Sequence, residues 1–436
     1  MGKSQDYYKK AKKIIPGGTQ LLSKKPELFL PDYWPAYYQK AGGCIIHDLD
    51  NKKYIDMITM GIGSCILGYA DPDVEKAVIS AVKNGSMSSL NCYEELELAQ
   101  LLIELHPWAE MVRYARSGGE AMSVAVRIAR AYSKKDKVLL CGYHGWHDWY
   151  ISANLNQDKA LDGHLLPGLK TSGIPRALTG LTLTFHYNDT EAFLKLFARH
   201  KNEIGAIVLE TIRNEEPDRD FISAISKTAQ KNHVPFIVDE ITSGWRLNTG
   251  GAHLLYGITP DIAVFAKGMS NGYPMAAVIG SKKVMDSAQD SFISSTYWTE
   301  RIGPAAALAT IRKMKKLNVQ KFITKTGKTI QQQWKELAER YKLKIKVSGI
   351  YPLSHFQFDY QEHAVLKTLF TQLMLEKGFL ASTVLYTSYA HKEQYTAQYF
   401  QAVNIVFKTL SEWLKLGNLK KHLKGPVCHS GFQRLN

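Results

Sequence analysis

Apolar and polar positions follow two different periods along this chain. Residues 5–14, 74–84 and 94–106 repeat apolar side chains at helical spacing, so each range is predicted to form a helix. Residues 43–57 instead contain two β-rich runs that flank a turn at Asp50-Asn51, which predicts a hairpin. The N-terminal part of the chain is therefore expected to mix helices with a small sheet.

From about residue 74 the pattern changes to short apolar runs that alternate with helical segments. Ala125, Ile128, Ala129 and Tyr132 lie at i, i+3, i+4 and i+7, which places them on one helix face. Strands that alternate with helices predict an α/β fold with a doubly wound, mostly parallel sheet. The predicted strands are 111–115, 138–141, 206–209, 236–238, 262–265 and 277–280.

The pattern beyond about residue 315 is that of an α+β region. Helices are predicted at 318–340, 361–377 and 391–418. We interpret residues 66–314 as a large domain. Residues 1–65 and 315–436 are expected to form a smaller α+β domain built from both ends of the chain.

Size and composition exclude several classes of protein. The 436 residues suffice for two cores, and no apolar run approaches the roughly 18 residues of a membrane span. Five widely spaced cysteines and the absence of an apolar signal core fit a reducing cytoplasm. The net charge of +15 is dispersed and no nucleic-acid motif accompanies it, so neither nucleic acid nor membrane is expected as a partner.

Three charged residues lie at or just past the ends of predicted strands. Because ligands of such sheets bind outside the carboxyl ends of the strands, Glu210, Asp239 and Lys267 are expected to share one crevice. The apolar run before Lys267 leaves its amine poorly solvated, which favours the neutral, nucleophilic form. Asp239 ends another apolar strand, where it either caps a helix or pairs with a buried cation. A lysine and an aspartate so placed suggest pyridoxal phosphate as the cofactor.

Two further segments supply what such a cofactor needs. Ser117, Gly118 and Gly119 follow a strand and open a helix, where amides and a hydroxyl can bind phosphate, although such a turn can also be simple punctuation. Residues 142–149 contain several aromatic and imidazole rings that suit a flat cofactor, or an aromatic loop at an interface. His144 and His147 are spaced i, i+3, but no further ligand pattern supports a metal, so none is expected.

Taken together, these motifs resemble the class III aminotransferases of pyridoxal phosphate fold type I, and most closely the glutamate-1-semialdehyde 2,1-aminomutase group. The motifs are Ser-Gly-Gly-Glu-Ala, Tyr-His-Gly, Val-Asp-Glu-Ile-Thr-Ser-Gly-Trp-Arg and Ala-Lys-Gly. The resemblance implies a large domain, in which a mostly parallel sheet lies between helices, and a smaller domain from both chain ends. It also implies that Lys267 carries the cofactor as an aldimine and moves the proton, while Asp239 pairs with the pyridine nitrogen. The remaining implied cofactor residues are Ser117, Gly118 and Gly119 at the phosphate, Tyr143 and Ile241 on the two ring faces, and Glu210 near the ring substituents.

The same resemblance implies a homodimer with shared active sites. Residues 294–304 match the family segment that reaches across the dimer interface to the partner's phosphate. Counting back from Pro304 makes Thr299 the expected donor, with Ser295 and Thr296 as alternatives.

The departures from the aminomutase pattern concern the substrate. Lys24 stands where the aminomutase has an arginine for the substrate carboxylate, and lysine lacks the bidentate fork. The candidate acceptor-binding residues are Trp146, Trp149, Trp298 and Arg301, in segments that resemble relatives associated with sugar and surface-polysaccharide modification. The expected activity is transfer of an amino group from an amino acid, L-glutamate, to a ketone or aldehyde on a sugar or sugar nucleotide. The alternatives are an intramolecular 2,1-aminomutase and a non-enzymatic member kept for binding or assembly.

Overall fold

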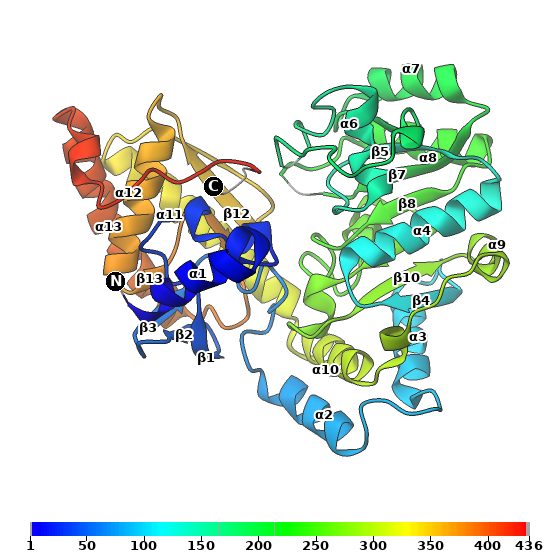
Figure 1. Cartoon of the computed structure of the whole chain (residues 1–436), viewed down its shortest axis with the longest axis horizontal. Coiled ribbons are helices and arrows are strands. Elements are labelled where there is room, and N and C mark those ends of the chain that lie inside the picture. Colours follow the sequence, from blue (N-terminus) through cyan, green and yellow to red (C-terminus); the bar gives the residue numbers. More distant parts are fainter. Residues whose placement is uncertain (1, 165, 213, 433–436) are drawn as a thin grey trace. The chain divides into compact units, whose positions relative to one another are not determined.

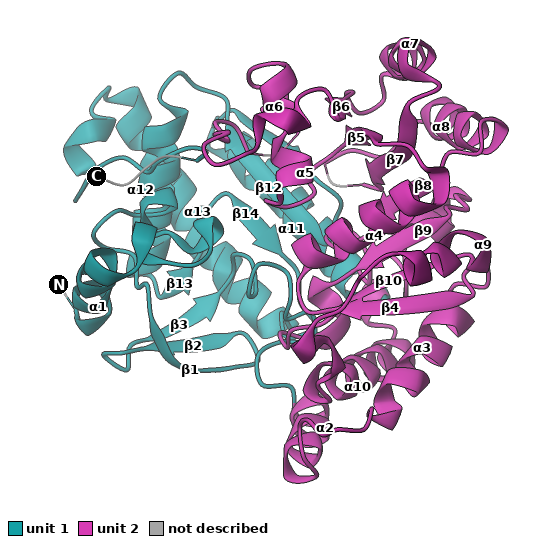
Figure 2. Cartoon of the chain, turned by 45° about the vertical axis from the view of Figure 1, so that its right-hand side comes forward, with its two compact units in different colours: residues 1–71, 321–436 teal, residues 72–320 magenta. Residues whose placement is uncertain are grey.

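The computed structural model describes residues 2–164, 166–212 and 214–432. The chain divides into two compact units, one comprising residues 1–71 and 321–436 and the other residues 72–320 (Figure 2). These divisions lie a few residues after the expected domain boundaries at 65/66 and 314/315.

Unit 72–320 is built around a seven-stranded sheet (Figure 1). Its strands pair in parallel except for β10, which runs antiparallel to both of its neighbours. The mostly parallel α/β sheet that the sequence predicted is therefore confirmed. In spatial order the strands are β4 (Met111–Ala115), β10 (Ala276–Gly280), β9 (Ile262–Phe265), β8 (Phe236–Asp239), β7 (Ile204–Glu210), β5 (Lys137–Cys141) and β6 (Thr182–Thr184).

The helices of this unit pack against the sheet or against one another. α4 (Gly118–Ser133) lies against β7, β8, β9 and β10, and its residues Ala125, Ile128 and Ala129 are fully buried, as the helical spacing predicted. α10 (Ile302–Leu317) packs against α2 and α3. The other helices are α2 (Pro72–Lys83), α3 (Tyr93–Leu105), α5 (Asp148–Ile151), α6 (Ala153–Asn156), α7 (Thr190–His200), α8 (Arg219–Lys231) and α9 (Lys282–Met285).

The other unit joins the two ends of the chain in one sheet. β1 (Tyr38–Gly42), β2 (Ile45–Asp48) and β3 (Lys53–Asp56) are antiparallel, and β13 (Phe379–Leu380) pairs with β3 in parallel. The predicted hairpin is β2–β3. A three-stranded sheet contains β11 (Ile345–Ser348), β12 (Leu353–Phe358) and β14 (Val384–Tyr386), and the helices are α1 (Lys3–Ile14), α11 (Val319–Arg340), α12 (His363–Glu376) and α13 (Glu393–Lys415). 

Aromatic side chains fill the core of this second unit. Trp334, Phe356, Phe370 and Phe407 are buried and contact one another at centroid distances of 4.9–5.9 Å. Across the part of the chain that the structure describes, no helix has both the length and the apolar character that a bilayer crossing requires.

Candidate active site

One edge of the seven-stranded sheet gathers the segments that the sequence singled out. β4 runs parallel to β9, because both are antiparallel to β10, and β5, β7 and β8 share that direction. The carboxyl ends of these five strands therefore meet at one edge, where ligands of such sheets bind. Glu210 and Asp239 are the last residues of β7 and β8, and the segments that follow β4, β5 and β9 carry Ser117, Tyr143 and Lys267.

Asp239 at the end of β8 is buried and has two partners in the protein. Its Oδ1 accepts a hydrogen bond from the Ile241 amide (2.9 Å), and its Oδ2 lies 2.8 Å from His144 Nδ1. The other ring nitrogen of His144, Nε2, lies 3.2 Å from the Cys141 carbonyl, so the ring lies between the Asp239 carboxylate and the end of β5. Sequence reasoning noted the His144 ring but missed this pairing, because nothing local links residues 95 positions apart.

Lys267 begins a short 3-10 turn, η6 (Lys267–Ser270), directly after β9. Its Nζ donates a hydrogen bond to Thr242 Oγ1 at 2.7 Å. The backbone of Lys267 is left-handed, with φ of 45°, a conformation that costs energy outside glycine and is found at functional sites. The left-handed backbone of Lys267 and the hydrogen bond to the Thr242 hydroxyl therefore both position its amine. The sequence analysis did not identify Thr242.

Tyr143 and Glu210 are joined through the loop that follows β5. The Tyr143 amide donates to Glu210 Oε2 (3.3 Å), and the preceding Gly142 has φ of 115°. A Cβ at Gly142 would lie 2.5 Å from the Glu210 Cβ, so only glycine allows this approach. His164 Nδ1 accepts the Gly142 amide hydrogen (3.1 Å), and burial, with smaller effects from two neighbouring histidines, lowers the pKa of His164 to about 4. His164 therefore stays neutral and keeps this acceptor at physiological pH.

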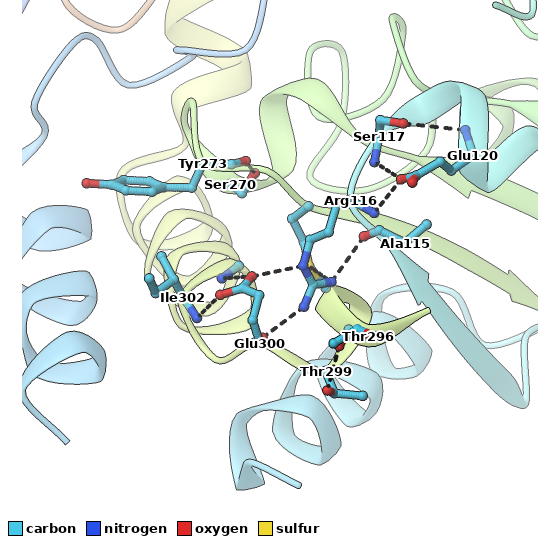
Figure 3. A network of polar contacts seen from close by, with 12 residues as sticks. Ala115, Arg116, Ser117, Glu120, Ser270, Tyr273, Thr296, Thr299, Glu300 and Ile302 are labelled. Carbon is cyan, nitrogen blue, oxygen red and sulfur yellow. Dashed lines mark hydrogen bonds and ion pairs between the residues drawn. The ribbon is translucent and has the colours of Figure 1, made fainter. Parts of the chain in front are cut away.

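The turn before α4 is closed by a capping box (Figure 3). Ser117 Oγ accepts the Glu120 amide (3.5 Å), while Glu120 Oε2 accepts the amides of Ser117 (2.9 Å) and Arg116 (3.1 Å). The box fixes the start of the helix.

The next two amides point to a phosphate site. Among the described residues, no acceptor is bonded to the amides of Gly118 and Gly119 in the first turn of α4. A Cβ on Gly118 would lie 2.8 Å from Ile241 Cδ1, and one on Gly119 would lie 3.0 Å from His147 Cδ2. Two glycine amides with free hydrogens at the N-terminus of a long helix, beside a serine hydroxyl, fit a phosphate group.

A buried network beneath the strand ends was not foreseen. Glu240 accepts hydrogen bonds from Thr211 Oγ1 (3.0 Å), Ser243 Oγ (2.7 Å), the His253 amide (2.7 Å) and His253 Nδ1 (2.8 Å). His253 Nε2 in turn accepts a hydrogen bond from Trp108 Nε1 (3.1 Å), so the network extends to Trp108. Burial raises the pKa of Glu240, but hydrogen bonds from His253 and Ser243 outweigh it and lower that pKa overall. Thr211 follows Glu210 and Glu240 follows Asp239, so the network joins the ends of β7 and β8.

The predicted partner-reaching residues lie at the surface of this unit. Thr299 ends the 3-10 turn η8 (Thr296–Thr299) and is exposed, with its Oγ1 donating to the Thr296 carbonyl (3.0 Å). Ser295 and Thr296 are exposed as well.

The candidate acceptor residues fall in different surroundings. Trp146 is 71% exposed, and together with Trp298 it lines a cavity of about 600 Å³ beside α4. Arg301 Nε and Nη2 each lie 2.8 Å from Glu94 Oε1, so part of its guanidinium is committed to an ion pair. Lys24 lies in a 3-10 turn (Leu22–Lys24) of the other unit.

Comparisons with known proteins identify the family of the chain. The family model described as aminotransferase class-III matches residues 31–387. Curated relatives include 3-aminobutyryl-CoA aminotransferase of Cloacimonas acidaminovorans (29% identical, covering 92% of this chain and 96% of that protein) and 2'-deamino-2'-hydroxyneamine transaminase of Streptomyces kanamyceticus (30%, 80% and 85%). Glutamate-1-semialdehyde 2,1-aminomutase of Methanobrevibacter smithii is 32% identical and covers 71% of this chain and 73% of that protein.

Solved structures share the fold over nearly the whole chain. The structure of the PLP internal aldimine form of the FumI protein from Sphingopyxis sp. MTA144 superposes with a TM-score of 0.86 at 22% identity, covering 95% of this chain and 98% of that one. The family match spans most of the sequence, and the fold agrees with it. The chain therefore belongs to the class-III aminotransferases, a family that uses pyridoxal phosphate.

Proposed function

We propose that this protein transfers an amino group from L-glutamate to a ketone or aldehyde on a sugar or sugar nucleotide. The observation that carries the proposal is the common strand edge, at which Lys267, Asp239 and the glycine amides of the turn before α4 all lie. Membership of the class-III aminotransferases supports the reaction type.

The side chains have two proposed roles: some hold the cofactor, and Lys267 also moves a proton. When bound, pyridoxal phosphate supplies an electron sink for the substrate carbon. Ser117, Gly118 and Gly119 would bind its phosphate, Tyr143 and Ile241 would flank the ring, and Glu210 would lie near the ring substituents. Asp239, which contacts His144, would hold the ring nitrogen. Lys267 would hold the cofactor and carry the proton at Nζ, which donates a hydrogen bond to Thr242.

The cavity beside α4 supports a polar, ring-shaped acceptor. Trp146 and Trp298 offer aromatic faces, which suit sugar rings. Three polar atoms of residues that line it, Ser123 Oγ, His147 Nε2 and Trp149 Nε1, are buried and lack a hydrogen-bond partner among the described residues. Arg301 and Lys24 are the candidate cations for a phosphate or carboxylate on the substrate.

The quaternary part of the proposal is a cytoplasmic homodimer in which Thr299 of each subunit binds the partner's cofactor phosphate. The exposure of Thr299 on η8 supports this arrangement, because its hydroxyl is accessible to a second copy.

The second candidate function is the intramolecular 2,1-aminomutase, which the 32% identity to a glutamate-1-semialdehyde 2,1-aminomutase favours. One assay separates the two activities. The purified protein, loaded with pyridoxal phosphate, is mixed with L-glutamate, and 2-oxoglutarate is measured. One equivalent per site is expected, and Lys267→Ala should abolish it.

Continued turnover then depends on adding an acceptor, for which a panel of sugar-nucleotide ketones serves as the probe. Conversion of a 1,2-amino-aldehyde without any amino acid or keto acid would replace the transaminase with the aminomutase.

A further inference from the structure

A partly buried ion pair joins the turn before α4 to the start of α10 (Figure 3). Arg116 Nε lies 2.8 Å from Glu300 Oε1, and the two side chains are only 11% and 17% exposed. Arg116 Nη2 also donates to the Glu300 carbonyl oxygen (2.8 Å). The Glu300 carboxylate in turn accepts the amides of Ile302 (2.6 Å) and Gly303 (2.8 Å). Arg116 therefore contacts both the backbone and the side chain of Glu300, and Glu300 in turn binds the first amides of α10.

The ion pair is of interest because the residue next to each partner in the sequence is proposed to bind a cofactor phosphate. Arg116 directly precedes Ser117 of the phosphate turn, and Glu300 directly follows Thr299. One subunit's own phosphate turn is therefore joined to the segment that is proposed to reach the partner's phosphate. Sequence alone does not show the link, because the pair spans 184 positions.

The other end of the exposed segment is anchored in the same way. Arg113 Nη2 of β4 donates to the carbonyl of Ile293, which is buried, and Arg127 Nη1 of α4 donates to the carbonyl of Phe292 (3.1 Å). Residues 294–297 between the anchors are exposed. The segment therefore projects from the unit while arginines from β4, α4 and the turn between them hold both of its ends.

We propose that the Arg116–Glu300 pair couples the two cofactor sites of a homodimer. This inference rests on the proposed function, in which Thr299 serves the partner's site. Phosphate bound at one turn would hold Ser117 and, through Arg116 and Glu300, would hold Thr299 in position for the partner. Because coupling between binding sites is reciprocal, an occupied partner site strengthens binding at the first.

Heterodimers of differently tagged subunits test this coupling. One subunit carries Lys267→Ala, so only the other subunit's site, the reporter site, gives the cofactor absorbance band that needs an amine at position 267. Pyridoxal phosphate is titrated into the apo-heterodimer with Glu300→Gln placed either in the reporter subunit or in its partner. Glu97→Gln, which breaks the half-exposed ion pair with Arg312, is the matched control.

Glu300→Gln is expected to weaken binding at the reporter site by about fivefold or more in both placements, the lower range of site-to-site coupling. Glu97→Gln should leave binding unchanged in both. If affinity falls only when Glu300→Gln is in the reporter subunit, the ion pair merely supports the phosphate turn of its own subunit. If affinity falls only when the change is in the partner, the ion pair merely positions Thr299. Either result, or no loss, overturns the coupling.

Two more variants keep the test decisive. Thr299→Ala in the partner subunit examines the shared site itself, and an unchanged affinity there would remove the proposed function's quaternary part. A loss with Thr299→Ala but none with Glu300→Gln in the partner would refute only the coupling. Arg116→Lys keeps the charge but loses the fork, so it takes the place of Glu300→Gln if that variant does not assemble.

Discussion

Replacing Glu240 with alanine removes the acceptor on which four buried donors converge. The hydroxyls of Thr211 and Ser243 and two N–H groups of His253 all point at this carboxylate, which has no exposed surface. A buried donor left without a partner costs about 1–3 kcal/mol. At the low end of that range for each of the four, Glu240→Ala destabilises unit 72–320 by about 4 kcal/mol.

Urea unfolding followed by tryptophan fluorescence measures this loss, since Trp108 belongs to the network. With an m value of up to about 3 kcal/mol per molar urea, the midpoint should fall by at least about 1 M. Glu240→Gln keeps the shape but turns an amide NH₂ toward donors, so it should be destabilised to a smaller extent.

The matched control is Glu191→Ala, which breaks an exposed i,i+4 pair with Lys195 and should change stability by less than about 0.5 kcal/mol. Equal midpoint shifts for Glu240→Ala and Glu191→Ala would refute the idea that the network holds the ends of β7 and β8 together.

Three other outcomes are expected. Gly118→Ala places a Cβ 2.8 Å from Ile241 Cδ1, which has to shift, and a binding free energy that is less favourable by about 1.4 kcal/mol would weaken pyridoxal phosphate binding about tenfold in a titration. Burial lowers the pKa of His391 to about 4, below its unfolded value of 6.5, so the unfolded chain binds the extra proton between these values and stability falls as the pH falls through that window. His391 alone contributes about 2 kcal/mol to the loss from pH 7 to pH 5, and His391→Gln should remove that share from the unfolding midpoints. Trp146→Ala should raise KM for the carbonyl acceptor and leave the L-glutamate half-reaction unchanged, whereas Leu194→Ala, at an exposed site on α7, should alter neither.

The sequence predicted the main sheet because each of its longer strands is a continuous apolar run between turn residues. β4 and β9 were predicted with the bounds that the structure has. β6 and β13 were missed because three and two residues carry no readable period. Long helices such as α11 were found for the opposite reason, since their period repeats many times.

Residues of the candidate site could be predicted only where they belong to short, continuous stretches of the sequence. The positions of Asp239, Lys267 and the Ser117 turn followed from strand ends, which are local features. The pairing of His144 with Asp239 depends on two loops that only the folded sheet brings together. Arg301 was predicted to bind the substrate, but part of its guanidinium forms an ion pair with Glu94. The sequence did not reveal this pair, because the two residues are more than 200 positions apart.

The place of β4 at the rim of the sheet also orders the assembly of the protein. Among the strands that the structure describes, β4 pairs only with β10, so the strand that leads into the phosphate turn gains its paired neighbour when residues 276–280 exist. Chains emerge from the ribosome at about 5–20 residues per second, and such distant pairing is slow to form. Nascent chains that end before β10 should therefore lack a fixed phosphate turn, and cofactor capture becomes a late event in biogenesis.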